Sequence, residues 1–255
     1  MNSIDVSNIT KTYESFTLHH FSLNVEKGQL YGILGPNGSG KSTIINLLSG
    51  QLKPNSGKIS ILNTNPITNS NATKEVIGII PEQETPPSFL TIREYLEFVC
   101  SVREVDVSQI DFFLKEFELK EYEHSLIKNL SRGNKQKVLF SQAFIHSPKV
   151  VLIDEPLINL DPIMQKKMKQ FLVNYVKKGN SILLSTHILS IAQEICTHIC
   201  ILRYGKTLYQ GNMRDIVTKK TTLEDYFMNI IEKSDNKSNK QGIEKKKKSN
   251  SKSEK

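Results

Sequence analysis

The chain has 255 residues, 38% of them hydrophobic, and a formal net charge of +8. This length fits one large α/β domain with a substantial core. Its longest clean apolar runs hold four residues, whereas a membrane-spanning helix needs roughly 18. The N-terminus lacks the basic-then-apolar order of a signal peptide, and Cys100, Cys196 and Cys200 follow no metal-ligand spacing. These features exclude a membrane-spanning class and favour a soluble intracellular protein with buried, reduced thiols.

The positive charge is concentrated in the C-terminal segment. Residues 232–255 hold nine lysines against four acidic residues, a net charge of +5, which leaves only +3 for the rest of the chain. From residue 234 onward there is a single aliphatic side chain, Ile243, so the segment cannot bury enough apolar surface to offset the entropy lost on ordering. We therefore predict an ordered domain over residues 1–231 and a disordered lysine- and serine-rich tail over residues 232–255.

The N-terminal part of the chain predicts a small antiparallel sheet. Residues 4–12 and 16–25 alternate apolar and polar side chains, the period of half-exposed strands, and Tyr13 lies on the connection between them. Residues 29–34 form a short apolar run typical of a buried strand, and residues 42–48 carry apolar side chains at helical spacing. Two further short strands are expected at residues 58–62 and 77–80.

The segment between that buried strand and that helix reads Gly-Pro-Asn-Gly-Ser-Gly-Lys-Ser-Thr. It fits the phosphate-binding motif G-x-x-x-x-G-K-[ST] in full, in the strand-to-helix context that the motif requires. Its glycines let successive backbone N–H groups turn toward phosphate oxygens, and the helix N-terminus adds a partial positive charge. Lys41 is suited to bridging the β- and γ-phosphates of a nucleotide, and the Ser42 hydroxyl to ligating Mg²⁺. The predicted phosphate-binding residues are Gly35, Pro36, Asn37, Gly38, Ser39, Gly40, Lys41, Ser42 and Thr43.

A helical segment interrupts the α/β pattern in the middle of the chain. The proline-rich stretch 81–87 cannot continue a strand and is predicted to be a loop. From Thr91 the apolar period becomes helical, and Glu94 three residues later completes a capping box. We expect a helical insert over about residues 88–147. Within it, further helices are expected at residues 108–117 and from about residue 131.

The α/β pattern resumes with a β-branched run that ends in two carboxylates, Asp154 and Glu155. Such a run is typical of a buried parallel strand, and open α/β sheets bind ligands at the carboxyl ends of their strands. Asp154 is therefore placed to hold Mg²⁺, and Glu155 to align or deprotonate an attacking water. The next strand ends at His187, which could hydrogen-bond a γ-phosphate. We expect strands at residues 181–185, 198–203 and 206–210, and helices from residue 162 and at 188–197 and 223–231.

The order of these motifs resembles that of the ATP-binding subunits of ABC transporters over about residues 4–230. After the phosphate loop comes Leu-Ser-Arg-Gly-Asn-Lys-Gln at residues 130–136, which resembles the family signature LSGGQ. The two carboxylates follow at 154–155, then Asp161 in a position similar to the family's D-loop, then His187 like its switch histidine. A phosphate loop alone would also fit GTPases, kinases and helicases, whereas the signature at this spacing is typical of ABC cassettes.

The resemblance implies an α/β fold: a P-loop ATPase core with a mainly parallel sheet, an N-terminal antiparallel β subdomain and a helical insert that carries the signature. It also implies ATP and Mg²⁺ as cofactors, in a head-to-tail dimer in which Ser131 and Gly133 of one subunit close on the γ-phosphate bound by the other. Tyr13 would stack on adenine, Glu155 would be the catalytic carboxylate and His187 its partner. The insert would contact a transmembrane permease, which would hold the protein at the cytoplasmic face of the cell membrane.

Two positions depart from the family pattern. The signature has Ser-Arg-Gly-Asn where the family has Ser-Gly-Gly-Gln, but it keeps the glycine beside the phosphate, so activity is expected to survive. In the loop after residue 80, Glu82 stands at the family's glutamine position and Gln83 follows it, which leaves open which of the two faces Mg²⁺. The motifs around this loop and at residues 185–190 resemble those of single-domain exporters of drugs and antimicrobial peptides.

Two other classes remain open on the sequence alone. One is a soluble ABC-type ATPase that is not coupled to transport, although the chain has neither the tandem cassettes nor the long coiled coil of such members. The other is a protein whose lysine-rich tail is the working part and binds nucleic acid or a membrane. The expected partners are a permease and a second ATP-binding subunit, identical or different. The tail suits an anionic membrane surface, and no nucleic-acid partner is expected.

Overall fold

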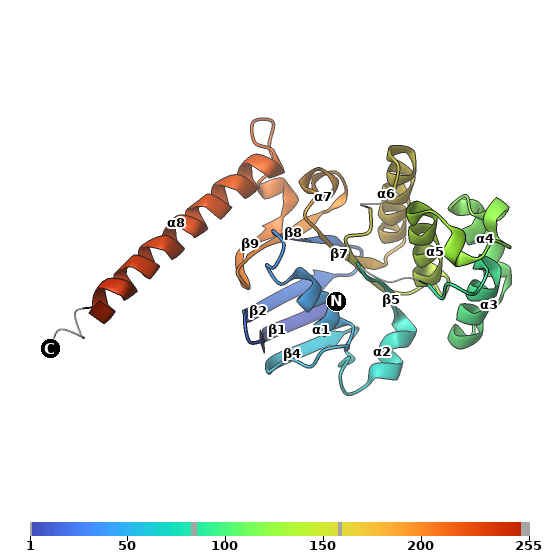
Figure 1. Ribbon diagram of the computed structural model, residues 1–255, viewed down its shortest axis with the longest axis horizontal. Helices are drawn as coiled ribbons and strands as arrows, with labels where there is room; N and C mark the ends of the chain where they lie inside the picture. The colour runs from blue at the N-terminus through green and yellow to red at the C-terminus, as the bar shows by residue number, and fades with distance from the viewer. Residues whose placement is uncertain (1, 83–85, 158–159, 251–255) are drawn as a thin grey trace.

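Two sheets form the body of the protein (Figure 1). The computed structural model describes residues 2–82, 86–157 and 160–250, with side chains described as far as residue 236. The antiparallel sheet has the order β2-β1-β4. The larger sheet has the order β5-β6-β7-β3-β8-β9; its first five strands, β3 included, run parallel, and β9 is antiparallel to β8. The strands are β1 (Asn2–Thr12), β2 (Thr17–Glu26), β3 (Leu30–Leu34), β4 (Ser56–Ile61), β5 (Ile77–Ile80), β6 (Val150–Asp154), β7 (Ser181–Thr186), β8 (His198–Arg203) and β9 (Lys206–Asn212). The predicted α/β fold with an N-terminal antiparallel sheet is confirmed.

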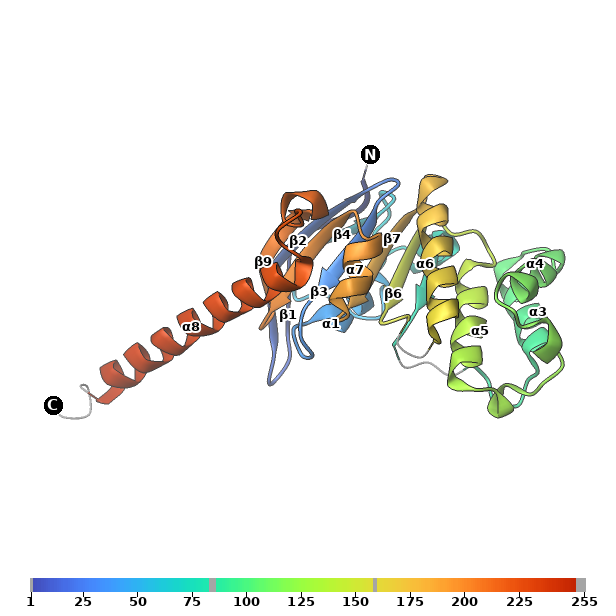
Figure 2. The same cartoon turned by 90° about the horizontal axis from the view of Figure 1, so that it is seen from above.

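Helices pack on the larger sheet and also build the insert, which lies at one end of the molecule (Figure 2). The helices associated with the sheets are α1 (Lys41–Leu48), α2 (Ser70–Val76), α6 (Pro162–Lys177) and α7 (Leu189–Ile195). The insert contains α3 (Ile92–Arg103), α4 (Ser108–Glu116), η1 (Lys120–Tyr122), η2 (Ile127–Asn129) and α5 (Arg132–Phe144). The short helix η3 (Met213–Asp215) and the C-terminal helix α8 (Leu223–Asn250) follow β9.

The strands of the larger sheet are buried on both faces. In β6, Val150 and Leu152 belong to the core shared with α1 and the antiparallel sheet, whereas Val151 and Ile153 belong to the core shared with α5, α6 and α7. Successive strand residues point to opposite faces, so a continuous apolar run is needed when both faces are covered. The sequence run before the two carboxylates therefore becomes the centre of the fold and fixes where its polar end lies.

Aromatic packing joins the insert to the sheet layer. Phe171 of α6 contacts Phe117 and Phe144 edge-on, with ring centroids 5.1 and 4.9 Å apart. Edge-to-face contacts of this kind add about 0.5–1.5 kcal/mol per pair beyond the buried area. The residues of α3, α4 and α5 thus share one hydrophobic core with β6 and α6 instead of forming a core of their own.

The local start and stop signals of the helices act as the sequence predicts. Thr91 and Glu94 form the reciprocal capping box of α3, and Asp161 caps α6 by accepting a hydrogen bond from the Met164 N–H (2.9 Å). That backbone bond lowers the pKa of the Asp161 carboxyl, since it favours the charged form. Helix α2 was not predicted, because its seven residues are mostly polar and bury only Thr73. The three cysteines are buried and free, as expected.

The C-terminal segment differs from its prediction. Instead of ending near residue 231, α8 continues as one helix to Asn250 and projects away from the body of the protein (Figures 1 and 2). The lysines, Gln241 and Glu244 of this segment are strong helix formers, which favours continuation of the helix. Arg203 of β8 also binds Asp235, which places the first turn of the predicted tail on the folded domain. Residues 251–255 lie outside the described part of the chain.

Candidate nucleotide site

The phosphate loop joins β3 to α1 and is held from several sides. Lys41, which is buried, donates from its ammonium group to the carbonyls of Gly35 (2.9 Å) and Pro36 (3.4 Å). Gly40 has φ 109°, and a Cβ there would lie 2.8 Å from the ring of Phe16, so this position requires glycine. Within the described chain no side chain caps the N-terminus of α1. Its first N–H groups are therefore available to an anion.

The carboxyl ends of β6 and β7 bring four polar residues together. Asp154 is paired with Ser185 in the sheet register, and the Ser185 hydroxyl donates to the Asp154 carboxylate. Glu155 follows at φ 50°, a left-handed conformation that is unusual for a non-glycine residue. This turn directs the Glu155 side chain toward Lys41, with 3.7 Å between Oε1 and Nζ. The loop cation and the strand-end carboxylate thus meet, as the sequence predicts.

Three further donors surround the Glu155 carboxylate. Its Oε2 accepts from the Thr186 hydroxyl (3.0 Å) and the backbone N–H of His187 (3.4 Å), and its Oε1 lies 2.7 Å from His187 Nδ1. Glu155 is only 8% exposed, whereas the His187 side chain is 47% exposed. A buried carboxylate with this many hydrogen-bond partners is fixed in position, which suits a group that must orient or deprotonate a water. The sequence analysis does not single out Ser185 and Thr186 as site residues, although they directly precede His187 at the end of a strand.

A cavity of about 720 Å³ opens beside these groups. One wall is the loop and the start of α1, and another is the connection between β1 and β2, which contributes Tyr13, Ser15 and Phe16. Tyr13 is 40% exposed, and its ring centroid lies 6.4 Å from that of Phe16. Glu82 lines the cavity as well, whereas Gln83 lies outside the described residues. The full lining is Tyr13, Ser15, Phe16, Asn37, Gly38, Gly40, Lys41, Ser42, Thr43, Glu82 and Glu155.

The oxygen groups at the cavity match the chemistry of a magnesium site that is completed by phosphates and water. Ser42 lines the cavity, whereas Asp154 is buried behind the lining, next to Glu155, and has its own orienting partner in Ser185. Magnesium binds in proteins through one or two such oxygen ligands together with substrate phosphates. Among the described residues no group of three His, Cys, Asp or Glu side chains forms a separate metal cage. These residues therefore fit the ion only together with a phosphate ligand.

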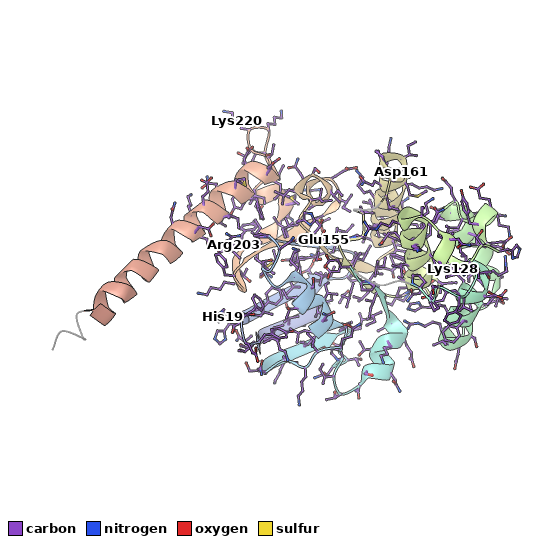
Figure 3. The ribbon with its side chains drawn as sticks, in the orientation of Figure 1. His19, Lys128, Glu155, Asp161, Arg203 and Lys220 are labelled. Atoms are coloured by element: carbon purple, nitrogen blue, oxygen red, sulfur yellow. The ribbon has the colours of Figure 1, made fainter. Side chains whose placement is uncertain are left out.

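The signature residues lie away from this cavity. Ser131 is the N-cap of α5 and accepts a hydrogen bond from the Asn134 N–H (3.2 Å), and Gly133 lies in the first turn of that helix. Ser131 borders a separate surface hollow with Asn129 and Asn134. In Figure 3 Glu155 lies near the centre of the molecule, whereas Lys128, just before the signature, lies out at the insert. One chain does not bring the signature to its own phosphate loop.

The comparisons with known proteins agree with this geometry. The family model described as ABC transporter matches residues 18–158, more than half of the chain. The chain belongs to the ABC transporter family. This ATP-binding subunit is an ATPase of the P-loop fold, and among its described residues no helix is long and apolar enough to cross a bilayer.

Relatives and solved structures show how much of the chain the similarity covers. The subunit is 30% identical to the Nod factor export ATP-binding protein I of Rhizobium meliloti (strain 1021), over 86% of this chain and 67% of that protein. It superimposes on the structure of an ATP-binding subunit of an ABC transporter with a TM-score of 0.83, 27% identity, and coverage of 89% of this chain and 99% of that one. A dimeric post-hydrolysis cassette bound to ADP and Pi aligns with a TM-score of 0.76 and 25% identity, covering 83% and 99% of the two chains.

Proposed function

We propose that this ATP-binding subunit binds Mg²⁺-ATP in the 720 Å³ cavity and hydrolyses it at a dimer interface, powering transport through a separate permease at the cytoplasmic face of the membrane. The single observation that carries this proposal is the meeting of Lys41, Glu155 and His187 beside the cavity. A cation for the phosphates, a carboxylate for the water and a second polar side chain at the same edge are the groups that phosphoryl transfer needs.

Each part of the cavity has a proposed task in binding. The N–H groups of the loop and of the first turn of α1 hold the phosphates, and Lys41 neutralises their charge by moving its ammonium from loop carbonyls to phosphate oxygens. Ser42 and Asp154 would hold Mg²⁺, with Glu82 or Gln83 nearby, and the ion would supply charge stabilisation of the transferring phosphoryl group. Tyr13 stacks on the base.

The proposed chemistry depends on Glu155. Its carboxylate orients the attacking water and takes up the water proton, because it is fixed by Thr186 and His187 and faces the cavity. His187 donates a hydrogen bond from its exposed side to the γ-phosphate, where negative charge develops in the transition state. General-base assistance of this kind contributes about 10²–10⁴-fold to the rate.

The proposed dimer supplies what the single chain leaves apart. Ser131 and Gly133 are proposed to complete the site of a second subunit, since Ser131 borders a hollow separate from the cavity and Gly133 lies in the first turn of α5 beside it. The related cassette with ADP and Pi is described as dimeric, which supports the same arrangement here. The partner could be an identical or a different subunit, and the insert would contact the permease.

Export is the proposed direction of transport. The support is the named function of the Rhizobium relatives, which export Nod factors, together with the resemblance to single-domain exporters. The lysine-rich part of α8 is proposed to rest on the anionic inner face of the membrane, where each lysine near the surface adds about 1 kcal/mol at low salt. Binding of nucleic acid is not part of the proposal.

Glu155→Gln tests the proposed chemistry. The variant should lose turnover by about 10³-fold, keep ATP binding, and elute as an ATP-dependent dimer in sizing chromatography with Mg²⁺. Lys41→Ala is the matched control, because it should lose nucleotide binding itself and therefore stay monomeric with ATP. Parental turnover in Glu155→Gln would contradict the role of Glu155 as the base.

Isolation from native membranes tests the coupling to transport. An affinity-tagged subunit should co-purify with a multi-span membrane protein, and ATPase activity should rise when the two are reconstituted in vesicles. A subunit that hydrolyses ATP at the same rate with and without any membrane partner, and that recovers none, would instead support an ABC-type ATPase without a permease.

A further inference from the structure

The turn between β8 and β9 lies directly against the phosphate loop. The Gly205 N–H donates to the Ser39 carbonyl (3.1 Å), and a Cβ at Gly35 would lie 2.6 Å from the Leu202 carbonyl. On the opposite side the Gly205 carbonyl accepts from the His19 N–H of β2 (2.8 Å). The turn therefore fixes the backbone of the loop against the strand that leads away from the Tyr13 connection.

This turn is conformationally demanding. Arg203 and Lys206 are paired, and the two residues between them both have positive φ, 49° at Tyr204 and 69° at Gly205. A two-residue turn with both φ values positive matches the twist of a hairpin, but it favours Asn or Gly where this chain has a tyrosine. A Cβ at Gly205 would lie 1.9 Å from the Thr17 carbonyl. Such a turn persists only when surrounding contacts hold it.

Helix α8 adds a side-chain contact to the backbone hydrogen bonds that hold this turn. Arg203 Nε and Nη2 donate to the two carboxylate oxygens of Asp235, at 3.1 and 2.9 Å. The same guanidinium lies 4.3 Å from the ring centroid of Tyr204 and donates to its hydroxyl (2.9 Å). The Arg203 side chain is 19% exposed, so the pair is partly shielded, and Figure 3 shows Arg203 where α8 leaves the body of the protein. A bidentate ion pair whose guanidinium also lies over an aromatic ring fixes geometry as well as distance.

We propose that Asp235 is a positioning residue for nucleotide binding. Asp235 holds Arg203, Arg203 holds the turn at Tyr204 and Gly205, and that turn braces the backbone of Ser39 in the phosphate loop. The C-terminal helix is thus coupled to the nucleotide cavity although none of its described side chains lines that cavity. This inference rests on the proposal that the cavity binds ATP.

The coupling must act in both directions. If the clamp between Asp235 and Arg203 favours a binding-competent loop, nucleotide binding must favour the clamp by the same factor. Hydrogen exchange of the α8 backbone around residues 232–236 should therefore slow when ATP is added to the full-length protein. A side chain with a merely structural role would show no such dependence on nucleotide.

Full-length variants test the clamp through the dissociation constant of ATP, measured under conditions without turnover. Asp235→Ala and the milder Asp235→Asn should each weaken ATP binding by about five-fold, the size expected for a partly shielded ion pair. Arg203→Met should do the same, and the double variant should be no worse than either single one, because the pair acts as a unit. The control is Glu118→Ala, which breaks the exposed pair with Lys167 (3.0 Å) and should leave binding unchanged.

The outcomes separate the clamp from the site. Lys41→Ala serves as the reference for the proposed cavity. If this variant does not bind ATP, the parent binds ATP through the cavity that contains Lys41. If Lys41→Ala loses binding while both Asp235 variants bind ATP as the parent does, the clamp is overturned and the site stands. Equal weakening by Glu118→Ala would also overturn it, as a general loss of stability. Parental binding by Lys41→Ala would overturn the cavity and the clamp together.

Discussion

The edge of the sheet around Glu155, proposed above as the catalytic edge, and the signature turn at Ser131 differ in how completely one chain assembles them. Glu155 is 8% exposed and has hydrogen-bond partners from β7 and the turn after it. Ser131 is exposed, and its hydroxyl caps its own helix through Asn134. A group that acts within its own chain can be buried and satisfied during folding. A group that acts on another subunit must stay exposed until that subunit arrives, which is how we interpret the signature.

The exposed turn is nevertheless well supported. It sits at the start of α5, and the same helix buries Phe140 and Phe144 in the core shared with α6. At the other end of α5, His146 binds the Ile77 carbonyl of β5 (2.9 Å). A site on a packed helix keeps its geometry without a partner. The two regions therefore differ in completeness, and both are rigidly placed.

Among the predictions that test this comparison, the largest effect is expected at the signature. Ser131→Ala should lower turnover by about 100-fold, the cost of losing one donor that stabilises charge in the transition state. ATP binding to the separate subunit should not change, because the residue lies outside the cavity. Steady-state ATPase rates and nucleotide titration of the isolated subunit measure the two effects. The comparison between the two regions fails if Ser131→Ala weakens ATP binding to the monomer.

Loss of the helix cap alone must be separated from that effect. Removing an N-cap costs about 1 kcal/mol of stability. Thr91→Ala removes the cap of α3 in the same insert and leaves the signature untouched, so it is the matched control. Comparable melting temperatures with a rate loss confined to Ser131→Ala would assign the loss to the signature hydroxyl.

The second prediction concerns the contact of His146 at the C-terminal end of α5 and the pH dependence of stability that it causes. Burial, and to a smaller extent the charge of Arg103, lowers the pKa of His146 from 6.5 to about 4. Between pH 6.5 and pH 4 the unfolded chain binds a proton at His146 that the folded protein does not bind. The contribution of neutral His146 to the free energy of unfolding is therefore fully present above pH 6.5 and is lost as the pH falls to 4. We expect the free energy of unfolding to fall by about 2 kcal/mol, a value reduced because His146 is partly exposed to solvent.

Urea unfolding at pH 7.0 and pH 4.5 measures this dependence, with His146→Gln as the reference. The glutamine variant cannot titrate there, so its stability should fall less between the two pH values than that of the parent. An identical fall in both proteins would show that His146 does not contribute to the pH dependence, and that the signature helix is seated by its aromatic contacts alone.

Motif order predicted the fold, and it predicted that the phosphate loop and the two carboxylates lie at one edge of the sheet, because both follow a strand and parallel strands end at one edge of a sheet. The fit of Glu155 between Lys41 and Thr186 could not be predicted in the same way. It depends on the left-handed conformation of Glu155 and on the register that pairs Asp154 with Ser185, and neither leaves a periodic signal in the sequence.

The C-terminal segment shows the opposite case. Composition predicted disorder from residue 232, because apolar burial was the only source of order considered. In the structure α8 continues through this region, and Asp235 makes a polar contact to a residue 32 positions earlier. A long-range ion pair is invisible to composition, and the helix propensity of lysine and glutamine extends α8 beyond it.

The third prediction tests whether the cavity wall contributed by the β1–β2 connection binds the base. Tyr13→Ala should weaken ATP binding about five-fold, the equivalent of the ~1 kcal/mol expected for one aromatic stacking contact. Tyr13→Phe should bind as the parent does, because the ring face and not the hydroxyl is used. Titration of the monomer with a fluorescent ATP analogue measures both. If the phenylalanine variant is as weak as the alanine variant, the hydroxyl is the contact and stacking is wrong.

The smallest expected effect concerns the metal side of the cavity, where this chain departs from the family's glutamine. Glu82 lines the cavity, and a carboxylate there adds a full negative charge beside Mg²⁺, which a neutral amide does not. Glu82→Ala should lower the ATPase rate and raise the Mg²⁺ concentration for half-maximal rate by about three-fold, since one oxygen ligand is lost. Gln83→Ala should change neither, and Glu82→Gln should restore the rate.

The Mg²⁺ dependence of the three variants decides which residue faces the ion. A shift confined to Gln83→Ala would mean that the loop is offset by one residue and that Gln83 takes the family's role. A shift in Glu82→Ala that Glu82→Gln does not reverse would mean that charge matters at this position, because the amide keeps the shape and loses only the charge. In that case the catalytic edge would use one more carboxylate than the family pattern requires, and the metal side would be the part of the site most particular to this chain.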